Sequence, residues 1–246
     1  ADAFRRSFEL FRDEHSSEIH QEIARFIKSE LNRVGETGDE VSFSYTPLDR
    51  HVIFNASLLA AETLAAAGKL AADTEMTELA RKAANFVIRR QRDDGAWVYG
   101  EKMRFAWVDN FHTAYILRSL RRLRTDVPGL ECDESIMRGL EFWLTSFFLD
   151  DGTPKYYDKE IYPVDIHSAA AAIVVLSELR DLDDSCVPLA EKVTQWTISN
   201  LRDKSGFFYY QKRREDVVKT PFIRWSNAWM LYALAKFLEA KNDANR

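Results

Sequence analysis

Four segments of the chain are apolar on almost every side. They begin at Phe54, Phe111, Ile166 and Ser226 and read FNASLLAAETLAAAG, FHTAYILRSLRRL, IHSAAAAIVVLSEL and SNAWMLYALAKFL. A helix that is hydrophobic all round is usually buried on all sides. The pattern therefore predicts four inner helices, each surrounded by other parts of the protein.

Helices of a second kind precede and separate these segments, with apolar residues on one face and charges on the other. They read SSEIHQEIARFIKSEL, TEMTELARKAANFVIRR, DESIMRGLEFWLTSFF and VPLAEKVTQWTIS. The apolar positions are Met76, Leu79, Ala83, Phe86 and Val87 in the second, Ile136, Leu140, Trp143, Leu144 and Phe147 in the third, and Leu189, Val193, Trp196 and Thr197 in the fourth. One-sided helices cover a core, so inner and outer helices are expected to alternate.

This alternation predicts an all-α fold, an α/α toroid of the six-hairpin type, in which inner helices form a ring and outer helices shield it. An incomplete arc of such a toroid and a plain solenoid remain open as alternatives. The opening residues ADAFRRSFELF read as the end of an inner helix and bring the count to about nine helices. A closed ring needs more helices. We therefore expect residues 1–246 to be a single toroid domain whose ring is completed by a missing N-terminal part or by a second chain.

Aligning the inner helices reveals an internal repeat. Asn55, His112, His167 and Asn227 fall at one equivalent position in the first turn, with spacings of 57, 55 and 60 residues. Each repeat is then one hairpin of an inner and an outer helix, and repeats of this kind bury their apolar faces against their neighbours. The equivalent positions are expected to lie on the same rim of the fold.

The connections between helices differ in length according to their direction. Those from an inner to an outer helix are short, whereas those from an outer to an inner helix are long and aromatic, as in RDDGAWVYGEKMRFAWVDN and DDGTPKYYDKEIYPVD. Long loops gathered on one side of a scaffold are where function usually lies. The rim that carries the aromatic loops is therefore the predicted functional side.

Composition narrows the classes of partner. The formal net charge is -5 and no block of Lys and Arg stands out, so nucleic acid is not an expected partner. Cys132 and Cys186 make neither a disulfide framework nor a metal-binding pair, which favours reduced thiols and a cytoplasmic location. No apolar run is long enough for a transmembrane segment.

The two first-turn histidines are the candidates for chemistry. His112 and His167 are expected to act as an acid/base pair, because imidazole titrates near neutral pH. Asp109 and Asp165 precede them, and three roles are possible for these aspartates. They cap the helices, they orient the histidines, or they are the two carboxylates of a glycoside hydrolase. The spacing does not favour a metal site, and no cofactor is expected.

The predicted ligand-binding residues lie on the rim that carries the aromatic loops. Aromatic rings offer flat apolar faces with a polar edge, which suits stacking against sugar rings. Helix N-termini favour oxygen-rich groups. The predicted substrate-binding residues are Asn55, Tyr45, Trp97, Trp107, Tyr157, Tyr162, Arg224 and Asn227.

Two short motifs suggest another chemistry. Gln91, Asp94, Gly95 and Trp97 match the Q-x-x-D-G-x-W repeat of triterpene cyclases, and residues 181–184 match the D-x-D-D motif of class II terpene cyclases. The first motif is expected to tie the end of an outer helix to the following turn. The second lies before an outer helix, where it favours an acidic helix start.

Five ordered motifs resemble one known family: FSYTPLDRHVIFNASLL, WVDNFHTAYILRSL, IYPVDIHSAAAAIVVLSEL, GFFYYQ and IRWSNAWMLYAL. They are similar to toroidal proteins encoded in capsule and exopolysaccharide gene clusters, which are longer at the N-terminus. The resemblance implies a six-hairpin glycosidase-like fold and a link to polysaccharide synthesis, and no catalytic residue carries over from it. The leading hypothesis is a carbohydrate-acting or carbohydrate-binding protein, with epimerase, lyase or hydrolase chemistry. An isoprenoid-handling toroid and a non-catalytic assembly module are the alternatives.

Overall fold

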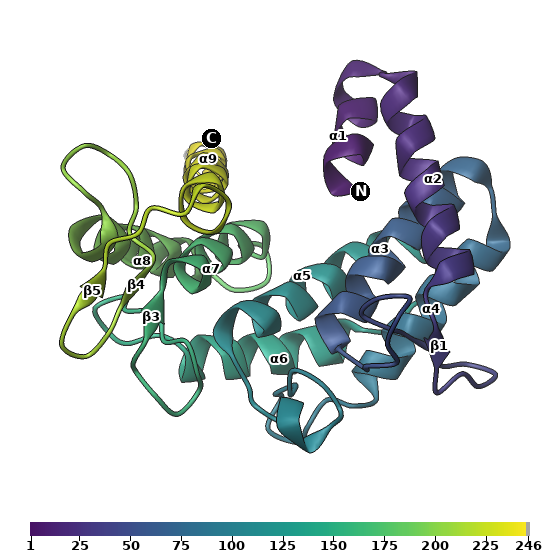
Figure 1. The fold of residues 1–246 in the computed structure, drawn as a ribbon, viewed down its shortest axis with the longest axis horizontal. Coiled ribbons are helices and arrows are strands. Elements are labelled where there is room, and N and C mark those ends of the chain that lie inside the picture. Colours follow the sequence, from purple (N-terminus) through teal and green to yellow (C-terminus); the bar gives the residue numbers. More distant parts are fainter. Residues whose placement is uncertain (245–246) are drawn as a thin grey trace. The chain divides into compact units, whose positions relative to one another are not determined.

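The computed structural model describes residues 1–244 and is dominated by helices (Figure 1). By its contacts the chain divides into two compact units. The first comprises Ala1–Asp93, Trp97–Ala106 and Ser119–Ile136, and the second comprises Asp94–Ala96, Trp107–Arg118 and Met137–Arg246. Two helices contribute residues to both units, namely α5 (Asn110–Asp126) and α6 (Asp133–Ser146).

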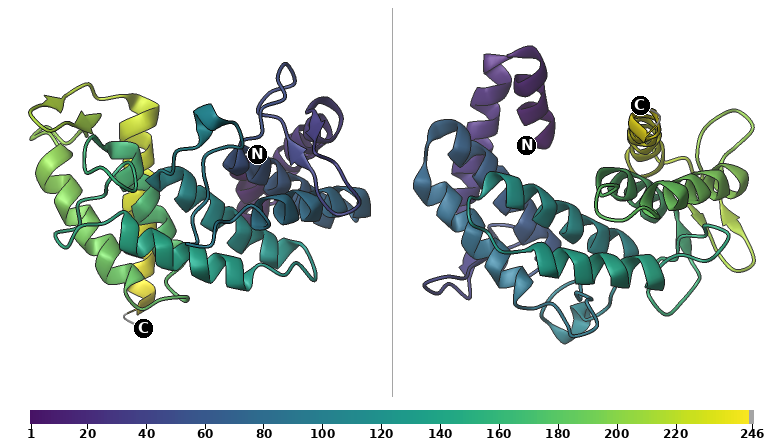
Figure 2. Two further views of the ribbon diagram at one scale, coloured as in Figure 1. Left: turned by 90° about the horizontal axis from the view of Figure 1, so that it is seen from below. Right: turned by 180° about the vertical axis from the view of Figure 1, so that it is seen from behind.

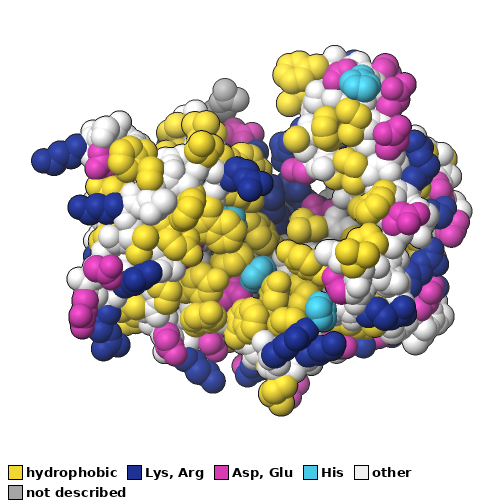
Figure 3. All heavy atoms as spheres, in the orientation of Figure 1, with side chains coloured by type: hydrophobic (Ala, Val, Ile, Leu, Met, Phe, Trp, Pro, Cys, Tyr) yellow, Lys and Arg dark blue, Asp and Glu magenta, His cyan; other side chains and the backbone are white. Residues whose placement is uncertain are grey.

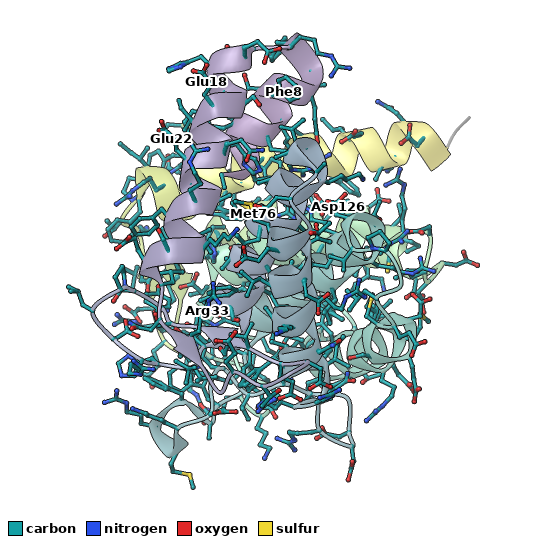
Figure 4. The ribbon with its side chains drawn as sticks, turned by 90° about the vertical axis from the view of Figure 1, so that its right-hand side faces the viewer. Phe8, Glu18, Glu22, Arg33, Met76 and Asp126 are labelled. Atoms are coloured by element: carbon teal, nitrogen blue, oxygen red, sulfur yellow. The ribbon has the colours of Figure 1, made fainter. Side chains whose placement is uncertain are left out.

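The first unit contains the helices α1 (Asp2–Phe11), α2 (Glu14–Glu30), α3 (Phe54–Ala71) and α4 (Thr74–Ile88), the short strands β1 (Arg33–Val34) and β2 (Ser42–Phe43), and the 3-10 turn η1 (Met103–Phe105). Consecutive helices pack against each other from α1 to α4. The exposed side of α2 carries Glu18 and Glu22, and its buried side carries His20, Ala24 and Ile27 (Figure 4).

The second unit contains α7 (Ile166–Glu178), α8 (Cys186–Leu201) and α9 (Trp229–Ala244), which pack against one another (Figure 2). A π-helical turn, η2 (Ile223–Ala228), leads directly into α9. Strands β3 (Val164–Asp165), β4 (Gln211–Lys212) and β5 (Val217–Val218) form a small antiparallel sheet in that order.

The predicted division into inner and outer helices is confirmed for most of the chain. All but one of the thirteen residues of α7 are buried, as are eleven of the eighteen in α3. The predicted apolar face of α4 is buried at all five positions. That of α6 is buried at Ile136, Leu140 and Trp143 and half-buried at Leu144, and Phe147, directly after the helix, is buried as well. On α8, Val193 and Thr197 are buried, whereas Leu189 and Trp196 are half-buried.

The prediction of all-round burial is wrong for α9. Leu231 and Leu238, seven residues apart on this helix, are 72% and 60% exposed. Residues at this spacing share one face of a helix. Within residues 1–244, α9 packs on α7 and α8 and leaves that face to solvent.

The internal repeat is visible in the backbone. Each of three inner helices begins with a residue whose N–H donates to the carbonyl of a tyrosine in the loop after the next outer helix. These bonds join Phe54 to Tyr99 (3.2 Å), Asn110 to Tyr156 (2.9 Å) and Ile166 to Tyr210 (3.0 Å). The aromatic loops are therefore fixed to the starts of the inner helices, where the candidate residues lie.

The turns in these loops also repeat. Gly95, Gly152 and Gly206 have φ values of 89°, 89° and 108°, in the region that favours glycine. In each turn an aspartate accepts a hydrogen bond from the backbone N–H two residues later: Asp94 from Ala96, Asp151 from Thr153 and Asp203 from Ser205. A Cβ on Gly152 would lie 2.6 Å from the backbone of Lys192 on α8, so the turn sits directly against the outer helix.

The two cyclase-like motifs have structural roles here. The indole N–H of Trp97 donates to the carbonyl of Val87 at the end of α4 (2.9 Å), as predicted. Gln91 instead exchanges hydrogen bonds with Ser135 on α6 (2.9 and 2.8 Å). Residues 181–184 directly precede Ser185, the N-cap of the outer helix α8, where Asp183 accepts from the Ser185 N–H and hydroxyl. No helix in the described part of the chain is long and apolar enough to cross a bilayer.

Candidate functional site

The start of α5 is held in place by buried hydrogen bonds within the second unit. The side-chain oxygen of Asn110 accepts from the indole N–H of Trp143 (2.8 Å), and its amide donates to the carbonyl of Lys155 (2.9 Å). Asn110 and Trp143 are fully buried. Because buried polar groups are costly to leave unpaired, these bonds fix the position of the first turn and of His112 within it.

Asp109 orients His112. Its carboxylate accepts from the indole N–H of Trp107 (2.9 Å) and from the His112 backbone N–H (3.0 Å), and Nδ1 of His112 lies 2.7 Å from its Oδ2. The Asp109 side chain is fully buried, whereas that of His112 is 19% exposed. A carboxylate on Nδ1 places a proton on that nitrogen and leaves Nε2 as the basic one. Asp109 and His112 therefore form the kind of pair that serves as a general base.

Asp165 occupies the equivalent place before α7 but does something different. Its Oδ1 accepts from the His167 backbone N–H (2.8 Å) and from the indole N–H of Trp225 (3.0 Å), and its Oδ2 accepts from the amide of Gln211 (3.5 Å). Burial raises the pKa of Asp165 to about 6, against the lowering effect of these hydrogen bonds. Asp165 thus binds the backbone of His167 and not its ring.

The imidazole of His167 is paired with a tyrosine. Nε2 of His167 lies 2.7 Å from the hydroxyl of Tyr115. The ring stacks on Trp225 at 4.1 Å between centroids and meets Trp229 edge-on at 4.8 Å. His167 is only 3% exposed, and burial, followed by the charge of His112, lowers its pKa to about 4. His167 is therefore neutral at pH 7.

Both imidazoles contact the same two rings. Phe111 lies 4.1 Å from His112 and 5.0 Å from His167 between centroids, and Tyr115 lies 6.5 and 6.0 Å from them. Figure 3 shows histidine atoms at the surface among hydrophobic side chains. We refer to His112, His167, Phe111, Tyr115, Trp225 and Trp229 as the histidine cluster.

The other predicted residues of the second unit divide into two groups. Trp107 is 36% exposed and bound to Asp109, and the half-buried Tyr157 pairs with Asp109 through a backbone bridge. Tyr162 is half-buried, and Arg224 is exposed one residue before Trp225. The half-buried Asn227 accepts from the Phe208 N–H (2.9 Å) and donates to the Phe222 carbonyl (3.3 Å), and its contact with a ligand stays a prediction.

Three predicted residues belong to the first unit. Trp97 is 1% exposed, so its predicted role as a sugar-stacking residue is wrong: both faces of the ring are covered and its N–H is bound to Val87. Tyr45 is 58% exposed, and Asn55 is buried with a side-chain oxygen that has no hydrogen-bond partner among the described residues. Their participation in one site with the histidine cluster stays a prediction.

Sequence reasoning missed several members of the cluster. Tyr115 follows His112 by three residues and thus lies on the same side of α5, a spacing that could have identified it. Trp225 and Trp229 are four residues apart, but Trp225 lies in a π-helical turn, which has no simple sequence signal. Residues 1–244 contain no group of three or more side chains suited to hold a metal ion.

Comparisons with known proteins identify the fold. No protein-family model matches the sequence, and no curated protein matches it. A cellobiose 2-epimerase from Bacillus thermoamylovorans matches with a TM-score of 0.74 at 9% identity, over 98% of this chain and 69% of that one. An unsaturated glucuronyl hydrolase specific for heparin matches with a TM-score of 0.72 at 16% identity, over 97% and 72%. A D-mannose isomerase matches with a TM-score of 0.71 at 9% identity, over 96% and 69%.

These likenesses span nearly the whole chain and at such identities concern the fold alone. The chain has the α/α-toroid fold of these structures, as the alternation of inner and outer helices predicts.

Proposed function

We propose that this protein is a carbohydrate-acting enzyme that moves a proton at a carbon of a sugar, with His112 as the general base. The observation that carries the proposal is the Asp109–His112 pair, with Nδ1 and Oδ2 2.7 Å apart, set among aromatic rings. A carboxylate behind an imidazole keeps the ring in one tautomer and stabilises the imidazolium that forms when the ring takes a proton.

Burial of both aspartates favours imidazole chemistry over carboxylate chemistry. A glycoside hydrolase of the usual kind needs two carboxyl groups that flank the scissile bond and reach the substrate. Asp109 and Asp165 are 2% and 1% exposed, and both are engaged by helix N–H groups and indoles. Orientation and capping are thus the roles that we assign to them.

Aromatic side chains around the histidines suit a sugar as the substrate. Trp107 is partly exposed beside Asp109, and Tyr157 and Tyr162 lie in the same long loop. Their rings would stack on the apolar face of a pyranose, while Arg224 would bind an oxygen-rich group. Three structures of the same fold are of proteins named as an epimerase, an isomerase and a glucuronyl hydrolase, which supports sugar chemistry for this one.

We place this activity in the production of surface polysaccharides, on a sugar precursor in the cytoplasm. The support is the resemblance of five ordered motifs to toroidal proteins of capsule and exopolysaccharide gene clusters. We further propose that helices beyond this chain complete the ring and cover Leu231 and Leu238 of α9. Hydrogen exchange of α9 should then be slower in the protein as it occurs in the cell than in residues 1–246 alone, and equal exchange rates would contradict this cover.

The experiment that tests the function is a substrate screen by proton NMR. Wild-type protein is incubated with aldoses, ketoses, disaccharides, unsaturated uronic acid disaccharides and a prenyl diphosphate, with His112→Ala run beside it. The proposal predicts conversion of a saccharide by the wild type and none by His112→Ala with an intact fold. Turnover of the prenyl diphosphate would favour an isoprenoid enzyme, and binding of a saccharide without turnover would favour an assembly module.

A further inference from the structure

The ring of His167 is covered and its Nε2 is already engaged. Trp225 stacks on one face, while Trp229 and Phe111 meet the ring edge-on at 4.8 and 5.0 Å. Nε2 lies 2.7 Å from the hydroxyl of Tyr115, and Nδ1 is buried without a hydrogen-bond partner among the described residues. A ligand could reach Nε2 only by displacing this tyrosine.

Tyr115 is better placed to meet a ligand. It is half-buried, whereas His167 is 3% exposed. Because it follows His112 by three residues on α5, the two side chains emerge on the same side of the helix. Burial raises the pKa of Tyr115 above its ordinary value, so the hydroxyl keeps its proton at neutral pH and remains a hydrogen-bond donor.

We propose that Tyr115 is the second substrate-contacting group of the site and that His167 is a positioning residue that holds its hydroxyl. This inference rests on the proposed function. His112 takes the proton from the sugar carbon, and the electron pair of the broken C–H bond moves to the adjacent carbonyl oxygen. Tyr115 keeps its proton and donates a hydrogen bond to that oxygen as it becomes an enolate. The enolate then rotates so that its opposite face meets His112, and return of the proton to that face restores the carbonyl with the configuration at carbon inverted.

Hydrogen-bond donors aimed at a developing oxyanion are effective because they need no reorganisation when charge appears. The bond to His167 holds the Tyr115 hydroxyl at one position, and the packed indoles hold His167 in turn. Both residues of the pair lie on helices within the second unit, Tyr115 in the first turns of α5 and His167 at the start of α7. Such support is what a precise donor requires.

Three variants separate the two residues. Tyr115→Phe removes the hydroxyl, His167→Gln keeps an amide able to bond the tyrosine hydroxyl, and Tyr156→Phe is the matched control. Tyr156 also packs against Phe111, at 5.6 Å between centroids. We expect Tyr115→Phe to lower kcat by about 10²-fold with KM changed by only about threefold. His167→Gln should retain kcat within about tenfold of the wild type, and Tyr156→Phe within about twofold.

Two kinetic results would overturn the inference while leaving the proposed function intact. The first is that Tyr115→Phe keeps the kcat of the wild type. The second is that His167→Gln loses as much activity as His112→Gln. Chemical modification of the histidines tests the burial of His167 without requiring that any sugar be converted. Diethyl pyrocarbonate acylates accessible neutral imidazoles, so peptide mapping should show His167 at least about tenfold slower than His112, as its burial requires. Equal rates at the two residues would refute the assignment.

Discussion

Nδ1 of His112 lies 2.7 Å from Oδ2 of Asp109, and the carboxylate is fully buried. At the equivalent position before α7, Asp165 accepts from the His167 backbone N–H, while Nε2 of that ring lies 2.7 Å from the hydroxyl of Tyr115. The repeat therefore supplies two similar helix starts with different chemistry. One imidazole is backed by a carboxylate, and the other is held neutral among indoles.

This difference predicts unequal effects of the same substitution at the two aspartates. Asp109→Asn keeps one oxygen to accept from the His112 backbone N–H, and it replaces the charged oxygen beside Nδ1 and the Trp107 indole by an NH2 group. We expect kcat to fall by about 10²-fold or more, the usual contribution of a general base. Asp165→Asn is the matched control and should keep kcat within about threefold, since this carboxylate does not orient a catalytic ring. Steady-state kinetics of the two variants would refute the asymmetry if they lost activity equally.

Opposite pKa shifts predict opposite pH dependences of stability. Burial raises the pKa of Asp165 from 3.8 to about 6, so its contribution to stability is present below 3.8 and is lost as pH rises through 6. Burial lowers the pKa of His167 from 6.5 to about 4, so its contribution is present above 6.5 and is lost as pH falls through 4. At about 1.4 kcal/mol per pKa unit, these shifts are worth at most about 3 kcal/mol for Asp165 and about 3.5 kcal/mol for His167.

Urea unfolding at several pH values tests this directly. Relative to the wild type, the unfolding free energy of Asp165→Asn should rise as pH increases from 4 to 6, because the cost of ionising Asp165 is gone. Relative to the wild type, that of His167→Gln should rise as pH decreases from 6.5 to 4. Parallel profiles for the three proteins would show that neither group is desolvated as described.

Much of this arrangement could be predicted from the sequence. The apolar runs of α3 and α7 and the one-sided pattern of α4 predicted burial correctly because helix periodicity records which sides face protein. The exposed face of α9 could not be predicted, because a helix buried on all sides and a helix with one exposed apolar face can have the same hydrophobic pattern. Alignment of the repeat found both histidines, but their unequal partners depend on Tyr115 and Trp225, which come 52 residues before and 58 residues after His167.

A single carbon added at a glycine of the loop turns should have a large effect on stability. Gly152 has a φ of 89°, and an added Cβ would meet the backbone of Lys192 at 2.6 Å. Gly152→Ala should therefore lower the unfolding free energy by about 2 kcal/mol or more. Gly38→Ala is the control, because nothing lies within 4 Å of the added carbon, and it should change stability by less than about 0.5 kcal/mol. Equal thermal midpoints for the two variants would contradict the tight packing of the turn on α8.

The central claim is that His112, backed by Asp109, removes a proton from a sugar carbon. The most direct measurement is deuterium incorporation into the sugar converted in the screen, with the protein in D2O and the C–H signals followed by NMR. We expect loss of one C–H signal with wild-type protein and with Asp165→Asn, and retention of that signal with His112→Gln. Conversion of the sugar by wild-type protein without deuterium at any carbon, or exchange by His112→Gln at the wild-type rate, would contradict it.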